Sequence, residues 1–239
     1  MKARLDQILT ERGLADSREK ARAMILAGNV TVDGQKAEKP GHFYSIDCRV
    51  EVAAPPPYVS RGGVKLAAAL DRFRISVQGS VCLDIGSSTG GFTDCLLQRG
   101  AATVWAIDVG RGQLAWKLRN DPRVVVREGV NARYLSPADF PRFDLAVCDA
   151  SFISATLLLP SMSALLKSHG EMVILVKPQF EVGRQQVGKG GIVRDPKWRV
   201  EACERVRAAA EALGFNAEIM DSPILGAEGN KEFLLHAYH

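Results

Sequence analysis

From residue 81 to the end of the chain, short apolar runs alternate with segments of helix length. The seven runs read VCLDI, TVWAID, RVVVRE, DLAVCD, EMVILVK, AEIM and EFLLHAY. Strands that alternate with helices in this way form a mostly parallel sheet with helices on both faces. The pattern therefore predicts an α/β, Rossmann-like domain with a mostly parallel seven-stranded sheet.

The pattern before residue 53 is different and predicts a small α+β module. Residues 4–13 and 16–28 have the spacing of two short helices, the second with Asp16 as its expected N-cap and Gly28 as its stop. Asp33-Gly34 between two short strand-like runs indicates a hairpin. The segment AAPPPY at 53–58 is a stiff linker, because consecutive prolines exclude helix and central strand. We expect domains at 1–58 and 59–239.

A glycine-rich turn follows the first apolar run of the larger domain. The run ends on Asp84, a small-residue loop with Gly86, Gly90 and Gly91 follows, and a helical pattern begins near Phe92. Glycine lets a ligand lie against the main chain, and a new helix offers unpaired N–H groups. The stretch is typical of a cofactor site, with an ordinary strand-to-helix turn as the alternative.

The loop departs from the dinucleotide pattern G-x-G-x-x-G, because its middle position is Ser88. Asp108 closes the second run, where its carboxylate could accept the hydroxyls of a ribose. A nicotinamide site is therefore less favoured, and the combination resembles the S-adenosylmethionine site of class I methyltransferases. The resemblance implies these cofactor-binding residues: Asp84, Gly86, Ser87, Ser88, Thr89, Gly90, Gly91, Phe92, Asp108, Glu128, Asn131 and Asp149. For Asn131 a polar turn residue is an equal alternative.

Charged residues close five of the runs: Asp84, Asp108, Glu128, Asp149 and Lys177. In a parallel sheet they all lie at one rim, where ligands bind. Lys65 comes just before the first strand and Glu232 begins the last one. The order Lys65, Asp149, Lys177 and Glu232 resembles the catalytic tetrad of FtsJ-type ribose 2'-O-methyltransferases. A ribose hydroxyl is a poor nucleophile until it is deprotonated, and a neutral lysine held by carboxylates can remove its proton.

Composition narrows the class further. The 239-residue chain has a net charge of +4, and its five cysteines contain no C-x-x-C pair, so we expect buried free thiols in a reducing cytoplasm. No apolar run approaches the ~20 residues of a membrane span, so we expect no membrane partner. Four histidines at no ligand spacing predict no metal.

Basic residues suggest an RNA partner. Residues 4–35 resemble the RNA-binding module named after ribosomal protein S4, although a solvated helix surface is the ordinary alternative. A second basic stretch at 178–200 has four glycines and little periodicity, which predicts a mobile loop able to clamp a phosphate backbone, with passive disorder as the alternative. The expected RNA-binding residues are Arg4, Arg12, Arg18, Lys20, Arg22, Arg61, Arg184, Lys189 and Arg194.

Together, the N-terminal module, the glycine loop and the tetrad resemble the TlyA or haemolysin A family of ribosomal RNA ribose methyltransferases over essentially the whole chain. The resemblance implies S-adenosylmethionine-dependent 2'-O-methylation, of cytidine, in ribosomal RNA or ribosomal subunits. RNA base methylation is an alternative, but Asp149-Ala150-Ser151-Phe152 lacks the two prolines of the Asn/Asp-Pro-Pro-aromatic motif. A membrane-active haemolysin is disfavoured. The oligomeric state stays open, and a monomer is compatible with the sequence.

Overall fold

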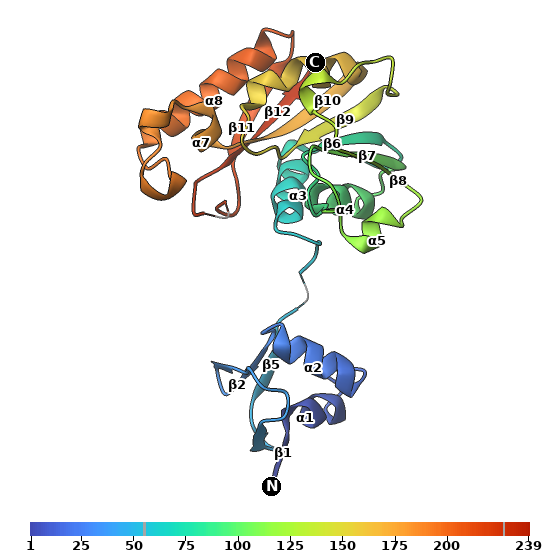
Figure 1. Cartoon of the computed structure of the whole chain (residues 1–239), viewed down its shortest axis with the longest axis vertical. Helices are drawn as coiled ribbons and strands as arrows, with labels where there is room; N and C mark the ends of the chain where they lie inside the picture. Colours follow the sequence, from blue (N-terminus) through green and yellow to red (C-terminus); the bar gives the residue numbers. More distant parts are fainter. Residues whose placement is uncertain (55, 227) are drawn as a thin grey trace. The chain divides into compact units, whose positions relative to one another are not determined.

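The structure is a computed structural model that describes residues 1–54, 56–226 and 228–239. The chain divides into two compact units, Met1–Pro56 and Pro57–His239. Figure 1 shows the elements of each unit.

In the part of the N-terminal unit that the structure describes, there are two short helices and five short strands. They are β1 (Lys2–Arg4), α1 (Leu5–Glu11), α2 (Arg18–Leu26), β2 (Val30–Val32), β3 (Gln35–Lys36), β4 (Phe43–Ser45) and β5 (Val50–Val52). β1 pairs with β4, and β2 lies between β3 and β5. The predicted hairpin is confirmed, since Val32 pairs with Gln35 across Asp33 and Gly34, both of which have positive φ.

The N-cap of α2 is one residue later than predicted. The Ser17 side chain accepts the backbone N–H of Lys20, whereas the Asp16 carboxylate pairs with the Lys20 ammonium. Ala21 and Ile25 of this helix are buried and pack with Leu5, Ile8 and Leu9 of the first helix. A small apolar core therefore holds the unit together.

The second unit contains the predicted seven-stranded sheet. Its strands are β6 (Val81–Ile85), β7 (Thr103–Asp108), β8 (Val124–Glu128), β9 (Phe143–Cys148), β10 (Leu166–Val176), β11 (Asn216–Asp221) and β12 (Phe233–Tyr238). The order across the sheet is β11-β12-β10-β9-β6-β7-β8. Only β12 runs antiparallel to its neighbours β10 and β11, so the expectation of a mostly parallel sheet is confirmed.

Helices cover both faces of this sheet (Figure 1). They are α3 (Gly62–Phe73), α4 (Gly91–Gln98), α5 (Trp116–Arg119), α6 (Leu159–Leu165), α7 (Pro178–Glu181) and α8 (Pro196–Glu211), with 3-10 turns η1 (Ala132–Tyr134), η2 (Ala155–Leu157), η3 (Arg184–Gln186) and η4 (Lys189–Gly191). One apolar core joins α3 and α4 to one face, and a second joins α6 and α8 to the other. All five cysteines are buried and free, as expected.

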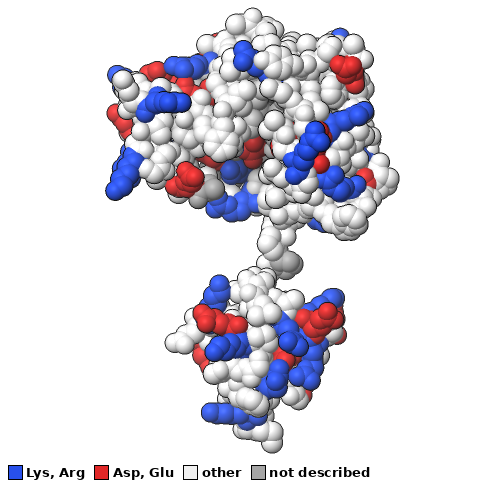
Figure 2. Space-filling model, viewed as in Figure 1, with Lys and Arg blue, Asp and Glu red and all other residues white. Residues whose placement is uncertain are grey.

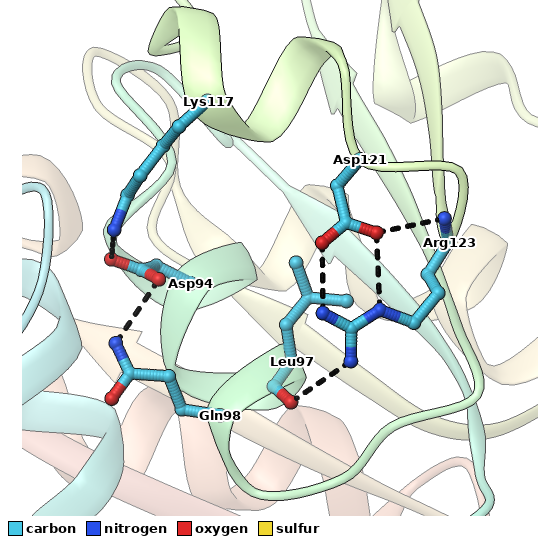
Figure 3. Close-up of polar contacts among 6 residues, drawn as sticks. All are labelled: Asp94, Leu97, Gln98, Lys117, Asp121 and Arg123. Atoms are coloured by element: carbon cyan, nitrogen blue, oxygen red, sulfur yellow. Dashed lines mark hydrogen bonds and ion pairs between the residues drawn. The ribbon is translucent and has the colours of Figure 1, made fainter.

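Polar contacts fix helix α4, which follows the glycine loop directly. The buried Asp94 carboxylate accepts the Lys117 ammonium of α5 and the backbone N–H of Val59. At the end of the helix, the Arg123 guanidinium donates to the carbonyl of Leu97 (Figure 3). Helix α4 is thus tied to three separate segments, which sets the position of the loop at its N-terminus.

Candidate active site

One cavity of about 740 Å³ brings together all four residues of the predicted tetrad. Lys65 comes from α3, Asp149 and Lys177 directly follow β9 and β10, and Glu232 directly precedes β12. Because β12 runs antiparallel to β10, the start of β12 and the end of β10 lie at the same edge of the sheet. The strand order therefore explains why residues so far apart in sequence meet here.

The first pair in the cavity is Lys65 and Glu232. The Lys65 ammonium donates a hydrogen bond to Glu232 Oε2 at 2.5 Å, and the side chains are only 8% and 4% exposed. A buried ion pair with hydrogen-bond geometry resists separation, since either partner alone would be a buried uncompensated charge. This pair is therefore a fixed part of the cavity wall.

The second pair is Lys177 and Asp149, and its contacts are of a different kind. Lys177 Nζ lies 2.6 Å from Asp149 Oδ1, yet this oxygen has no hydrogen bond of acceptable geometry among the described residues. The hydrogen bond of Lys177 goes instead to the Ser151 hydroxyl, at 2.8 Å. The lysine is thus held by charge on one side and by a directional bond on the other.

Two further cavities adjoin this one along the glycine loop. A cavity of about 540 Å³ is bordered by Gly86, Ser88, Asp108, Asn131 and Asp149, together with apolar residues from β6, β7 and the loop after β9. A smaller cavity of about 160 Å³ is bordered by the glycine loop and also by Asp149 and Lys177. The loop residues at this smaller cavity are Gly86, Ser87, Ser88, Thr89, Gly91 and Phe92.

The backbone at Gly86 and the carboxylate of Asp108 shape the larger of these two cavities. Gly86 has φ +77°, and a Cβ there would lie 2.8 Å from the carbonyl oxygen of Asp149. The Asp108 carboxylate accepts the backbone N–H groups of Ser88 and Gly110. A side chain at position 86 would close the approach to the main chain, so glycine is required there.

Three residues expected at the cofactor do not border either cavity. Asp84 is fully buried, accepts the Thr93 hydroxyl at 2.6 Å, and burial raises its pKa to about 7. Gly90 lies against the side chain of Leu118. The Glu128 carboxylate accepts the backbone N–H of Gly112 and pairs with Arg119 at 2.5 Å, contacts that lower its pKa. Their assignment to the cofactor stays a prediction.

Sequence reasoning missed several residues that border the cavities. Ser60 and Ser151 border both the small cavity and the 740 Å³ cavity. Phe152 is 92% exposed, has φ +65° and borders both the 740 Å³ and the 540 Å³ cavity, with its ring 5.3 Å from that of Phe180. A positive φ at a bulky residue is uncommon and marks a position held by its surroundings. No pattern in the sequence signals that conformation.

The segment expected as a mobile loop is folded in the structure. Asn230, 1% exposed, accepts the backbone N–H of Val193 and donates to the carbonyl of Gly191. One buried amide thus ties the segment to the turn before β12. The three expected RNA contacts Arg184, Lys189 and Arg194 are exposed on this segment, and Arg61 borders the 740 Å³ cavity.

Most of the basic residues expected to contact RNA in the N-terminal unit have partners within the unit. Arg4 makes a two-fold hydrogen bond to Asp6, Arg18 lies 3.6 Å from the same carboxylate, and Lys20 pairs with Asp16. Figure 2 shows lysines and arginines interspersed with acidic residues on the face of this unit that is in view.

Arg12 and Arg22 differ from this group and from each other. Arg12 donates to the backbone carbonyls of Ile46 and Cys48, so its guanidinium links the first helix to the chain segment after β4. Arg22 is exposed and forms no ion pair with any acid that the structure describes. Of the expected cations in this unit, Arg22 is the one most available to a partner.

Comparison with known proteins agrees with this geometry. The FtsJ-like methyltransferase model matches residues 58–238, and the S4 domain model matches residues 3–46. The chain belongs to the FtsJ-like methyltransferase family. The predicted class I methyltransferase fold with a small N-terminal S4 domain is thereby confirmed, and so is the expectation of an enzyme.

Relatives at high identity extend over nearly the whole chain. The chain is 49% identical over 238 residues to the 16S/23S rRNA (cytidine-2'-O)-methyltransferase TlyA of Mycobacterium tuberculosis, covering 98% of this chain and 89% of the relative. It is 50% identical over 241 residues to the "Putative rRNA methyltransferase YqxC" of Bacillus subtilis, covering 99% and 86%. The solved "Putative hemolysin from Streptococcus thermophilus" is 44% identical with a TM-score of 0.76, covering 99% of this chain and 88% of that one.

Two further findings bear on the other predicted partners. Within the described residues, no helix combines the length and apolar character that a bilayer crossing requires. Histidine, cysteine and acidic side chains form no cluster suited to a metal ion in the same part of the chain.

Proposed function

We propose that this chain transfers a methyl group from S-adenosylmethionine to the 2'-hydroxyl of a ribose, that of a cytidine in ribosomal RNA. The observation that supports this most is the cavity with two lysine–carboxylate pairs, which adjoins the cavities along the glycine loop. A site that must deprotonate a hydroxyl beside a methyl donor needs a base at this junction. Lys177 is at the junction, since it borders both the small cavity and the 740 Å³ cavity.

The described residues fit S-adenosylmethionine. The Asp108 carboxylate suits the two hydroxyls of its ribose, the apolar border with Asn131 suits adenine, and the Ser87–Ser88–Thr89 turn suits the methionine end. When bound, the cofactor supplies a methyl group that is strongly electrophilic because it is carried by a positively charged sulfur, which departs as a neutral thioether.

The chain's own residues then have separate tasks. The neutral amine of Lys177 accepts the proton of the ribose hydroxyl as the oxygen forms its bond to the methyl carbon. Asp149 stabilises the resulting ammonium through its charge, 2.6 Å away. Lys65, fixed by Glu232, keeps a positive charge in the cavity wall, where it stabilises the negative charge that develops on the oxygen.

RNA binding is assigned to the N-terminal unit and to exposed groups near the cavity. Phe152 offers an exposed ring at the cavity border on which the base of the target nucleotide can stack. The relative TlyA is named a 16S/23S rRNA (cytidine-2'-O)-methyltransferase. The proposal takes the cytidine and the ribosomal RNA from this name. A ribosomal substrate implies that the reaction occurs in the cytoplasm.

The experiment is a labelling assay on ribosomal subunits. Separated 30S and 50S subunits from a strain that lacks this protein are incubated with the purified chain and methyl-labelled S-adenosylmethionine, and the RNA is then digested to nucleosides. We expect the label in 2'-O-methylcytidine. The Lys177→Ala variant, assayed in parallel, should leave the RNA unlabelled.

Label on a base would establish the alternative of base methylation. Absence of label from both subunits and from free rRNA, with the cofactor shown to bind by calorimetry, would reject an RNA substrate of this kind. Label on the ribose of another nucleoside would keep the reaction and reject the cytidine assignment.

A further inference from the structure

We propose that Ser151 is a positioning residue for the proton transfer: its hydroxyl sets the rotation of the Lys177 amine so that the lone pair faces the ribose hydroxyl. This inference rests on the proposed function, because it assumes that Lys177 is the base. In this inference, the hydrogen bond to Ser151 orients the Lys177 amine, and the charge of Asp149 stabilises its protonated form.

Lys177 makes one ion contact and one hydrogen bond, and each is made to a different residue. The side chain is 10% exposed and its Nζ has two near neighbours, Asp149 Oδ1 at 2.6 Å and Ser151 Oγ at 2.8 Å. Only the serine contact has hydrogen-bond geometry. An ion pair depends mainly on distance, whereas a hydrogen bond weakens steeply away from linearity. The Ser151 oxygen is therefore the group that favours one rotation of the amine over others.

This matters because a neutral amine is not symmetric. The ammonium form has three equivalent N–H donors, so its rotation has no chemical consequence. Once the amine is neutral, it has two N–H groups and a single lone pair, and only the lone pair can accept a proton. Fixing one N–H on Ser151 confines the lone pair to the remaining directions, which include the cavity that Lys177 borders.

The serine is itself held in place by its loop. Asp149 donates its backbone N–H to the carbonyl of Ile85 in β6, before the serine. After the serine, Ser154 Oγ and the backbone N–H of Ala155 both donate to the buried carboxylate of Glu181, at 2.6 and 2.7 Å. Both ends of the turn are thus anchored, so Ser151 can act as a fixed reference for the amine.

Ser154 provides a matched control on the same turn. Its hydroxyl is bonded to Glu181 and makes no contact with Lys177 among the described hydrogen bonds. Ser154→Ala therefore disturbs the loop without removing the partner of the amine. Ser151→Ala removes that partner, and Ser151→Thr retains a hydroxyl at the same position of the side chain.

The experiment measures single-turnover methyl transfer to the ribosomal substrate for wild type, Ser151→Ala, Ser151→Thr, Ser154→Ala and Lys177→Arg. For Ser151→Ala we expect the rate constant at saturation to fall about 10- to 100-fold, the equivalent of a lost hydrogen bond to a charged group. KM for the RNA and the calorimetric affinity for S-adenosylhomocysteine should stay within about twofold. Ser151→Thr should recover most of the rate. Ser154→Ala should keep it, because the backbone N–H of Ala155 still bonds Glu181 and anchors that end of the turn.

A second readout does not depend on activity. In ¹⁵N NMR of lysine side chains, the Lys177 Nζ signal is identified by its absence from Lys177→Arg. We expect its protons to exchange with water faster in Ser151→Ala than in wild type or Ser154→Ala, because one N–H is no longer bonded.

The inference would be overturned by a wild-type rate in Ser151→Ala, by a threonine variant as slow as the alanine variant, or by an equal loss in Ser154→Ala. A loss confined to S-adenosylhomocysteine affinity would make Ser151 a cofactor contact and would also reject it. Failure of the proposed function looks different. In that case Lys177→Arg keeps its activity, or wild type labels a base, whatever the serine variants do.

Discussion

Two lysine–carboxylate pairs face the same cavity, yet they differ in how firmly each lysine is held. Lys65 and Glu232 are nearly inaccessible and joined by a hydrogen bond, whereas the Lys177–Asp149 pair has side chains that are 10% and 23% exposed and lacks hydrogen-bond geometry. Separating Lys65 from Glu232 would leave an uncompensated buried charge, so this pair is a fixed part of the cavity wall. The more open pair is the one suited to exchange a proton with a substrate.

One cavity thus holds two lysines in different surroundings, which under the proposed function have the tasks of a fixed charge and of a base. Each lysine has one carboxylate, so the number of charges does not distinguish them. They differ in the burial of the carboxylate, which is 4% exposed at Glu232 and 23% at Asp149, and in the hydrogen bond of the lysine, which goes to the carboxylate for Lys65 and to Ser151 for Lys177. Changing one partner at a time tests this distinction.

The largest effect is expected at Lys177. Lys177→Ala and Lys177→Arg should each lower single-turnover methyl transfer about 10²- to 10⁴-fold, the usual contribution of a general base. Arginine retains the charge but has no accessible neutral form that could accept a proton. Lys65→Arg, which keeps a fixed positive charge, should lose at most about tenfold.

Both lysine variants need a check of cofactor affinity by calorimetry and of folding by circular dichroism. Equal losses in Lys65→Arg and Lys177→Arg would erase the distinction between the pairs. Near-normal turnover in Lys177→Arg would reject Lys177 as the base and leave it an electrostatic role.

The second prediction concerns stability. Glu232→Ala leaves the Lys65 ammonium buried without a counter-charge and should lower the free energy of unfolding by about 3 kcal/mol. Asp149→Ala should cost less, because the Asp149 side chain is 23% exposed against 4% for Glu232. The three tryptophans, Trp105, Trp116 and Trp198, all belong to the second unit, so urea unfolding followed by their fluorescence reports on it. A larger loss for Asp149→Ala would reverse the comparison.

Much of this arrangement could be predicted from the sequence because strand ends determine position. Asp149 and Lys177 directly follow β9 and β10, and neighbouring parallel strands end at the same edge of the sheet. The hydrophobic pattern predicted the strands, and the resemblance to FtsJ-type enzymes supplied Lys65 and Glu232. The structure places all four on one cavity, while their catalytic roles stay predictions.

What the sequence could not predict depends on contacts between distant segments. Glu128 closes a strand as Asp108 does, but its carboxylate is used by Arg119 and Gly112 and does not border the cavities. Arg12 finds the carbonyl of Cys48, 36 positions away. Phe152, whose ring is exposed, has a positive φ that no local pattern encodes. The sequence position of a charged or aromatic residue therefore does not indicate which distant residue it contacts in the fold.

The third prediction concerns Asp84, a buried carboxylate with no lysine. Its oxygen Oδ1 has no hydrogen-bond partner among the described residues, and burial raises its pKa from 3.8 to about 7. The folded state therefore holds a proton that the unfolded state releases, so the contribution of Asp84 to stability falls as pH rises from about 4 to about 7.

Asp84→Asn isolates this contribution because asparagine does not titrate. We expect the free energy of unfolding of wild type, relative to Asp84→Asn, to fall by about 2 kcal/mol between pH 5 and pH 7. Urea titrations of both proteins at each pH provide the measurement. A constant difference across this range would show that Asp84 titrates as an ordinary carboxyl. The absence of a lysine beside Asp84 would then have no effect on its protonation.

The smallest effect is expected in the N-terminal unit, where we compare an arginine bonded within the protein with one that is not. Arg22 is exposed and unpaired with any described acid, whereas Arg12 is bonded to two backbone carbonyls. Arg22→Ala should weaken rRNA binding about two- to fivefold, reduce the slope of log affinity against log salt by about 1, and leave the melting temperature unchanged. Arg12→Ala should instead lower the melting temperature of the N-terminal unit, because two carbonyls lose their donor. Filter binding at three salt concentrations, with calorimetric melting of each variant, separates the two outcomes. The contrary result would be that Arg12→Ala reduces the salt slope as much as Arg22→Ala does, without loss of stability. An arginine bonded within the protein would then still be available to RNA, and an internal partner would not indicate which arginines of this unit bind RNA.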